Sequence, residues 1–261
     1  MQNHRSGASS PDMSRLRTNT RQMKKRAAQR RAKFCLFLVA AAVFSIMFLT
    51  PLFDIRSVSI SGAEKVTSEQ TDGIVRSVEG QNLFTVGIKK FRDNLLAIPY
   101  VKDAEVKRKL YPPSLTVTLT ERVPVAYIAT AGGFVIIDET CTVLETSLQP
   151  PTGIPGITGV SPKSPVPGQK IDIDETDKSD IIVLCIGTLG HMSDKIKNID
   201  VTDTENISFD YENRLRVLCG SSLDFKEKIQ LFEEAVNSNR LEANARGTMD
   251  LSNTGKAFHK P

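Results

Sequence analysis

Few residues of this chain have the type and spacing that catalysis or metal binding would require. The three histidines, His4, His191 and His259, have no partner at metal-ligand spacing. No GxSxG, HExxH, phosphate-binding or dinucleotide-binding motif occurs in the sequence. We therefore predict no catalytic residue, no cofactor or cofactor-binding residue and no metal ligand, and we interpret the histidines as solvated or structural.

The cysteines also favour a structural role. Cys35 lies in an apolar stretch, whereas Cys141, Cys185 and Cys219 are far apart and odd in number. This arrangement lacks the CxxC spacing of metal or redox sites and indicates no disulfide framework. We expect buried, small apolar side chains.

An acidic run in the second half of the chain resembles a calcium loop only superficially. Counted from Asp172, Asp177 stands where an EF-hand needs glycine, and Val183 stands where it needs glutamate. A solvated acidic loop is the better interpretation. The run consists of Asp172, Asp174, Glu175, Asp177 and Asp180.

The elements that could position any site begin with a membrane segment. Positions 34–53 hold no charged residue, and twenty helical residues at about 1.5 Å each span roughly 30 Å, the hydrocarbon thickness of a bilayer. Residues 1–33 carry ten Lys/Arg residues and one acidic residue, a bias that favours the cytoplasmic side. We predict a basic cytoplasmic tail over 1–33, expected to be disordered, one transmembrane helix over 34–53 in contact with the lipid bilayer, and an extracytoplasmic remainder.

Three other interpretations of the N-terminal region are weaker. A cleaved signal peptide would carry a shorter apolar region and a small-residue cleavage site. A buried helix of a soluble protein would usually present a polar face. The basic tail could bind nucleic acid, but Lys and Arg beside an apolar span more simply orient it and contact anionic lipid. We predict no nucleic-acid partner.

The sequence after the apolar stretch predicts a compact unit in the order strand, helix, helix, strand, strand. Alternating apolar residues predict the strands, and apolar residues at helical spacing predict the helices. Thr67 and Gln70 resemble a capping box that opens the first helix. The predicted elements are strand 56–60, helix 67–80, helix 88–96, strand 104–108 and strand 115–120.

Within this unit the chain resembles a known family. The runs Ile98-Pro99-Tyr100-Val101-Lys102-Asp103-Ala104-Glu105-Val106-Lys107-Arg108, Tyr111-Pro112 and Glu121-Arg122-Val123-Pro124-Val125-Ala126 are similar to the POTRA signature of the bacterial division proteins FtsQ and DivIB. The resemblance implies an α+β fold, with an extracytoplasmic POTRA domain (β-α-α-β-β) over 54–122, a mixed β-rich domain over 123–258 and a C-terminal end at 259–261. Glu121 and Arg122 could suggest an active site, but an exposed or structural ion pair at the domain junction is the favoured interpretation.

The second domain is predicted in less detail. The strand at 134–138 resembles the family's opening strand, and Thr140-Cys141 replaces a glycine of the following turn. Residues 150–168 hold six of the thirteen prolines and are predicted to form a long irregular loop within the domain. The other predicted elements are a helix at 181–189 capped by Ser179 or Asp180, a hairpin at 207–217 turning at Glu212-Asn213, an amphipathic helix at 225–236 and a closing edge strand at 247–252.

The resemblance also implies the function. It is that of a non-enzymatic division protein at the septum, which binds FtsL-type and FtsB/DivIC-type bitopic proteins outside the membrane, links them to septal peptidoglycan synthesis and has no small-molecule substrate. Strand addition at the closing strand is the expected mechanism, and core packing of Leu251 and Phe258 is an equal alternative. The predicted partner-binding residues are Asp250, Leu251, Ser252, Asn253, Thr254, Gly255, Ala257 and Phe258.

Two other functions stay open. The first is a membrane-anchored extracytoplasmic hydrolase that uses Ser and Lys or Asp side chains at a spacing the sequence does not reveal. The second is a POTRA component of outer-membrane protein assembly. Such proteins usually repeat the unit and add a barrel, whereas this chain shows one copy and no series of transmembrane strand patterns.

Overall fold

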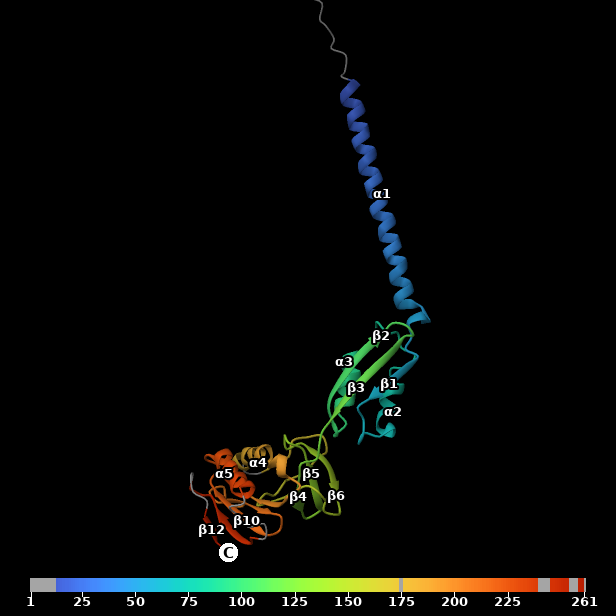
Figure 1. Cartoon of the computed structure of the whole chain (residues 1–261). Helices are drawn as coiled ribbons and strands as arrows, with labels where there is room; N and C mark the ends of the chain where they lie inside the picture. The colour runs from blue at the N-terminus through green and yellow to red at the C-terminus, as the bar shows by residue number, and fades with distance from the viewer. Residues whose placement is uncertain (1–12, 174–175, 239–244, 254–257, 261) are drawn as a thin grey trace, which may run out of the picture. The chain divides into compact units, whose positions relative to one another are not determined.

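The computed structural model describes residues 13–173, 176–238, 245–253 and 258–260 (Figure 1). Over these residues the chain is a mixed helix and sheet structure with one N-terminal apolar helix, which confirms the predicted α+β class. The chain divides into two compact units. The α1 unit extends to Ser57 and includes Glu79–Val86 and Arg108–Leu115; the second unit comprises Val58–Val78, Gly87–Lys107 and the residues from Thr116 onward.

The N-terminal helix α1 (Met13–Leu49) differs at both ends from the predicted span over 34–53. It stops before Thr50, because the following Pro51 disfavours helical backbone at the residue before it; Pro51–Phe53 form the short 3-10 helix η1. The expectation of a disordered tail is wrong from Met13 onward. Its Arg, Lys, Ala and Gln residues favour helix, and extending an existing helix needs no new nucleus.

A candidate for the predicted membrane helix is present within α1. The stretch Gln29–Phe48 is long and apolar enough to cross a membrane, and none of it is buried against the rest of the protein. Large side chains such as Phe34, Phe37 and Val43 are more than half exposed. An exposed apolar surface of this length is consistent with a helix that spans a membrane.

The β-α-α-β-β order predicted for the first domain is confirmed. Gln70 Oε1 accepts a hydrogen bond of 3.1 Å from the Thr67 N–H, as a capping box requires. The strands form a sheet in the order β1-β3-β2. The elements are β1 (Ser57–Ser61), α2 (Ser68–Arg76), α3 (Ile88–Leu96), β2 (Val101–Lys109) and β3 (Ser114–Glu121).

The described residues after β3 form a nine-stranded sheet in the order β12-β11-β10-β9-β8-β7-β4-β5-β6. The pairs β4–β7, β7–β8 and β10–β11 are parallel, and the others are antiparallel. The strands are β4 (Ala126–Thr130), β5 (Gly133–Ile137), β6 (Val143–Ser147), β7 (Gly156–Thr158), β8 (Ile196–Asp200), β9 (Ile207–Tyr211), β10 (Leu215–Gly220), β11 (Gly247–Asp250) and β12 (Phe258–Lys260).

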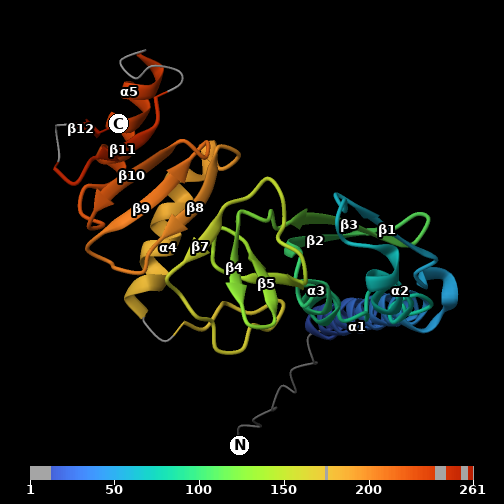
Figure 2. The same cartoon turned by 90° about the horizontal axis from the view of Figure 1, so that it is seen from below.

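Two helices pack against this sheet, α4 (Thr176–Leu189) and α5 (Phe225–Asn237), with the 3-10 turn η2 (Gly190–Met192) following α4 (Figure 2). The apolar stripe predicted for α5 lies in the core. The Phe232 ring meets the rings of Phe209 and Tyr211 edge to face, at centroid distances of 5.4 and 5.0 Å. Such contacts fix α5 on β9.

Two predictions about the second domain are wrong. The proline-rich segment 150–168 is not wholly irregular, because β7 within it pairs with β4 and β8 in the middle of the sheet. Three residues are too few to show strand alternation. Helix α4 begins at Thr176, so Ser179 and Asp180 lie inside it and do not cap it. The hairpin turning at Glu212-Asn213 is confirmed.

Gly159, directly after β7, is predicted to be irreplaceable. Its φ is +88°, and a Cβ there would lie 2.1 Å from the Thr202 nitrogen, whereas Gly153 has φ +83° and no neighbour within 4 Å. Gly153→Ala should therefore cost about 1 kcal/mol of left-handed strain, and Gly159→Ala about 1–3 kcal/mol more from the clash. Urea unfolding followed by circular dichroism measures both; equal midpoints would refute the clash.

Candidate partner-binding surface

The end of the nine-stranded sheet that carries the predicted partner-binding residues begins with the β9–β10 hairpin. Glu212 and Asn213 have φ of 50° and 54°, the left-handed values of a type I′ turn, whose twist matches that of paired strands. The hairpin places Leu215 opposite Tyr211 and Val217 opposite Phe209. These four side chains are buried, so the register of β10 is fixed by the core.

Strand β11 lies beside β10 and parallel to it, with Leu215 opposite Gly247 and Val217 opposite Met249. A parallel neighbour requires a crossover connection, and α5 is that connection. Met249 and Leu251 are each 1 % exposed, and the Leu251 N–H donates a 2.8 Å hydrogen bond to the Leu218 oxygen. Leu251 therefore packs in the core, as the alternative interpretation held.

Strand β11 is not the edge of the sheet, contrary to the prediction for the closing strand. Strand β12 pairs with it antiparallel, with Thr248 opposite Lys260 and Asp250 opposite Phe258. A strand of three residues is too short for an alternation pattern to reveal it. The outer backbone groups of β12 form this edge of the sheet among the described residues.

The predicted partner-binding residues occupy different environments. Phe258 is 52 % exposed on β12. At the end of β11, the Asp250 carboxylate accepts a 2.9 Å hydrogen bond from the Ser252 N–H, while Ser252 and Asn253 are exposed. Thr254, Gly255 and Ala257 lie outside the described residues.

The opposite edge of the sheet is already covered in part. There, the Val143 N–H of β6 donates to the Gln169 oxygen at 2.9 Å, and the Gly168 N–H donates to the Val143 oxygen at 2.8 Å. Residues from the proline-rich segment thus occupy the start of the β6 edge. Among the described residues, no strand pairs with the outer side of β12, so its backbone groups can accept another strand.

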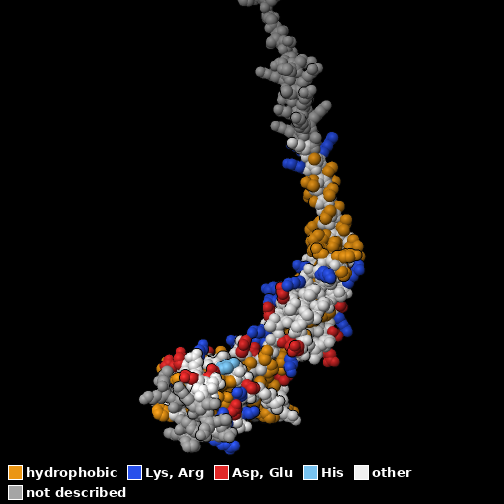
Figure 3. Space-filling view, in the orientation of Figure 1, with side chains coloured by type: hydrophobic (Ala, Val, Ile, Leu, Met, Phe, Trp, Pro, Cys, Tyr) orange, Lys and Arg blue, Asp and Glu red, His pale blue; other side chains and the backbone are white. Residues whose placement is uncertain are grey.

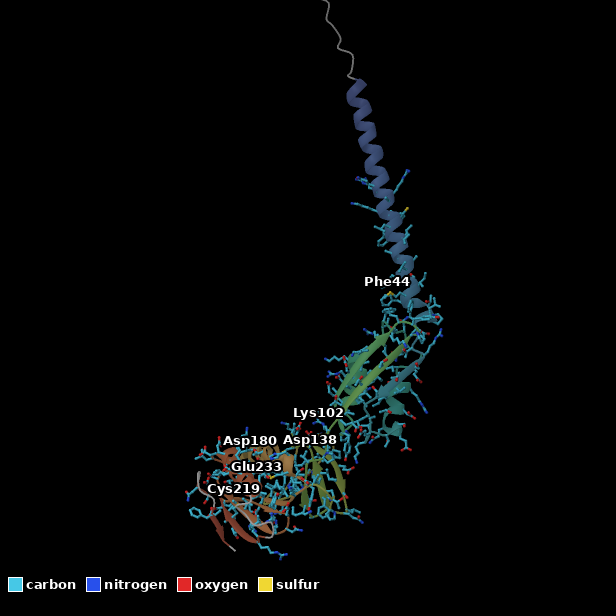
Figure 4. The ribbon with its side chains drawn as sticks, in the orientation of Figure 1. Phe44, Lys102, Asp138, Asp180, Cys219 and Glu233 are labelled. Atoms are coloured by element: carbon cyan, nitrogen blue, oxygen red, sulfur yellow. The ribbon has the colours of Figure 1, made fainter. Side chains whose placement is uncertain are left out.

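A cavity of about 230 Å³ lies between η2, β9 and α5. His191 Nε2 contacts the Glu233 carboxylate at its rim, and Figure 4 labels Glu233 on α5. Because a histidine beside a carboxylate could activate a nucleophile, its surroundings bear on the hydrolase alternative. No Ser, Thr or Cys is among the described residues that line the cavity: His191, Met192, Asp194, Lys195, Tyr211, Phe232, Glu233, Val236 and Asn237.

Cys141, Cys185 and Cys219 are buried, as predicted. Burial raises the pKa of the Cys141 thiol to about 11 and those of Cys185 and Cys219 to about 12. These thiols are therefore protonated and unreactive at neutral pH. Within the described part of the chain, no three His, Cys, Asp or Glu side chains are grouped to hold a metal; Asp174 and Glu175 of the acidic run lie outside it.

Glu121 and Arg122 do not pair with each other, contrary to the prediction, because each has another structural partner. The Glu121 carboxylate accepts hydrogen bonds of 2.8–3.0 Å from the N–H groups of residues 64–66. Burial opposes its ionisation, but these three donors outweigh burial and lower the pKa of Glu121. Its role is to hold the loop that precedes α2.

Arg122 instead contacts Asp138, which follows β5; the Nη1–Oδ2 distance is 2.6 Å, and the two side chains are 22 % and 3 % exposed. Asp138 Oδ1 also accepts N–H bonds from Thr140 at 2.9 Å and Thr142 at 2.8 Å. These bonds hold the turn in which Cys141, with φ 60°, adopts the left-handed backbone usual for glycine. Figure 4 shows Asp138 near Lys102 of β2, which pairs with Glu139 at 2.7 Å.

The comparisons with known proteins agree with this architecture. The family model of the POTRA domain, FtsQ-type, matches residues 53–122. The cell division protein FtsQ of Mycobacteroides abscessus is 33 % identical over 135 residues, 52 % of this chain and 43 % of that protein. The cell division protein DivIB of Clostridium acetobutylicum is 23 % identical over 214 residues, 80 % of this chain and 83 % of that protein. These matches support membership of the FtsQ/DivIB family.

The relatives match different lengths of the chain. A third relative, the cell division protein FtsQ of Corynebacterium glutamicum, is 32 % identical over 102 residues, 39 % of this chain and 46 % of that protein. The matched region thus spans less than half the length of these two FtsQ relatives, whereas the DivIB match extends across most of both chains. The signature residues quoted from the sequence lie before and on β2, in the β2–β3 turn, and from the last residue of β3 to the first residue of β4.

Sequence reasoning missed two features of the structure. Asp138, the partner of Arg122, is 16 residues away in the chain, and no local sequence pattern predicts a contact at that separation. The pairing of β12 with β11 depends on hydrogen bonds across the sheet. A short apolar and basic run, Ala257-Phe258-His259-Lys260, was the only available signal for β12.

Proposed function

We propose that this member of the FtsQ/DivIB family works without catalysis in cell division, by binding other bitopic division proteins through the β12 edge of its nine-stranded sheet. The partners are FtsL-type and FtsB/DivIC-type proteins, which it links to septal peptidoglycan synthesis. The observation that carries the proposal is the edge itself: β12 ends the sheet among the described residues, and its outer backbone is open to a further strand.

Strand addition supplies both affinity and specificity. An extended segment that joins β12 exchanges its main-chain hydrogen bonds with water for bonds to the sheet, and its alternate side chains meet the side chains of the edge. The exposed Phe258 ring supplies apolar contact area, and Asp250, Ser252 and Asn253 supply polar groups beside it. Thr254, Gly255 and Ala257 belong to the same proposed surface. Leu251 supports it from the core.

Position in the cell follows from the N-terminal helix. We place residues before α1's apolar stretch in the cytoplasm and both folded domains outside the membrane, because Lys and Arg next to a membrane span favour the cytoplasmic side. The protein then acts at the division septum. The names of its relatives, the cell division proteins FtsQ and DivIB, support this role.

Imaging and co-purification of the full chain test the proposal together. A fluorescent fusion should form bands at midcell in dividing cells, and the same chain purified from detergent-solubilised membranes should bring bitopic division proteins with it. Protease added to intact cells, with the outer membrane opened where one is present, should remove both folded domains. Uniform membrane fluorescence, with no bitopic division proteins recovered, would contradict the proposed role. Substrate turnover by the chain, together with labelling by a serine- or cysteine-reactive probe, would contradict it as well.

A further inference from the structure

The turn between β2 and β3 exposes two large side chains. Leu110 is 58 % exposed and Tyr111 is 91 % exposed. Both follow the basic residues Arg108 and Lys109, which are exposed as well. An apolar and an aromatic side chain beside lysine and arginine, at the tip of a hairpin, form a surface that mixes apolar area with positive charge.

This turn belongs to the same compact unit as the membrane helix. The Arg56 N–H donates a hydrogen bond of 3.0 Å to the Pro113 oxygen, which ties the turn to the segment leaving α1. On that segment Leu52 is 62 % exposed. The turn is therefore held against Arg56, which lies a few residues after the end of α1.

The end of α1 is itself held to the folded part of the unit. Asn82 Nδ2 donates a 3.0 Å hydrogen bond to the Met47 oxygen in the last turn of the helix. The Phe84 ring contacts the rings of Phe48 and Phe53, at centroid distances of 5.9 and 5.2 Å. These contacts prevent the unit from swinging freely about residues 50–56, so the turn stays near the level at which α1 leaves the bilayer.

The charges around the turn suit an anionic surface. Arg56, Arg108 and Lys109 are exposed, and none of them has a salt-bridge partner among the residues that the structure describes. The acidic residues of the unit beyond α1 are Asp54 and Glu79. Figure 3 shows Lys and Arg side chains gathered where the apolar surface of α1 ends.

We propose that the β2–β3 turn is a second membrane contact of this protein, in which Tyr111 and Leu110 enter the interfacial layer and Arg56, Arg108 and Lys109 bind the phosphates of anionic lipids. Tyrosine rings are stable at the level of lipid headgroups, where one end of the ring is apolar and the other is hydrated. Basic residues close to the membrane are attracted to anionic lipid. The bilayer is the expected partner of this turn because α1 anchors the turn beside it, so that the second contact forms intramolecularly.

The chain has no tryptophan, so Tyr111→Trp introduces a single fluorescent reporter at the turn. The full chain carrying it is reconstituted into vesicles of phosphatidylethanolamine and phosphatidylglycerol, with and without brominated acyl chains. The matched control is Leu148→Trp, at a site 87 % exposed in the second unit. We expect the indole at position 111 to emit at shorter wavelength and to be quenched by brominated lipid, and the control to do neither.

A second comparison tests the charges. Adding Arg108→Gln and Lys109→Gln to Tyr111→Trp should reduce quenching in the anionic vesicles, and replacing phosphatidylglycerol by phosphatidylcholine should reduce it in the parent variant. Tyr111 is an exposed residue, so the reporter does not disturb packing, and circular dichroism verifies the fold. Emission at position 111 that matches the control in every vesicle would overturn the membrane contact. Quenching that stays the same after the glutamine substitutions and after the change of lipid would overturn the role of the basic residues.

Discussion

A chain that ends at Asn253 should stay folded and lose its division partners. Truncation there removes β12 but keeps Met249 and Leu251, which are each 1 % exposed, and keeps the hydrogen bond between the Leu251 N–H and the Leu218 oxygen. Removal of the receiving strand takes away every main-chain bond of the proposed interface. We expect recovery of the bitopic partners from solubilised membranes to fall to background, with little change in the urea midpoint.

A point substitution refines this prediction. Phe258→Ala removes the exposed ring of β12, and loss of an aromatic anchor at an interface costs on the order of 2 kcal/mol, which is about 30-fold in affinity. Leu223→Ala is the matched control, because Leu223 is also exposed, at 71 %, and lies outside β12. Undiminished recovery of the partners by the folded chain ending at Asn253 would show that they bind another surface.

Asp138→Asn should destabilise the second unit more than any exposed ion-pair substitution. Asp138 is 3 % exposed and pairs with Arg122 at 2.6 Å, and its other oxygen organises the turn at Thr140–Thr142. Removing one partner of a buried pair leaves the other charge uncompensated, which costs about 3 kcal/mol. Urea unfolding of the full chain in detergent, followed by circular dichroism, measures the loss.

The neighbouring residue supplies the control. Glu139→Gln also removes a carboxylate from a short ion pair, 2.7 Å from Lys102, but these side chains are 57 % and 48 % exposed. Solvent screens such a pair, and its loss should cost about 0–1 kcal/mol. Equal costs at positions 138 and 139 would show that burial does not set the strength of the Arg122–Asp138 pair.

The same pair gives stability a defined dependence on pH. Burial of Asp138 opposes its ionisation, but hydrogen bonds from Thr142, Thr140 and Arg122 outweigh burial and lower its pKa in the folded state. Because the pKa of Asp138 is lower in the folded than in the unfolded state, its ionised form stabilises the fold. This contribution is complete above the unfolded pKa, about 3.9, and is lost as the pH falls through the folded pKa. The difference in unfolding free energy between the unaltered chain and Asp138→Asn should therefore become smaller below about pH 4. A difference that stays constant to lower pH would contradict the assignment of this stability to ionised Asp138.

The sequence by itself determined the elements whose signals are local. The capping box at Thr67 and Gln70, the apolar spacing of α3 and the turn at Glu212-Asn213 each lie within a few residues, and all are found in the structure. The long apolar stretch likewise predicted a membrane helix from composition alone. These features depend on backbone preferences and on the spacing of apolar residues, and both are contained within a short stretch of sequence.

Only the tertiary structure decided which strand closes the sheet and which partners the polar residues have. Strands β7 and β12 are three residues each, and they exist because longer strands offer backbone groups beside them. Arg122 could have paired with Glu121, but the sheet brings Asp138 to it instead. Hydrogen bonds and ion pairs between distant residues depend on how elements pack, so the open edge at β12 and the buried pair at Asp138 followed from the fold rather than from any local pattern.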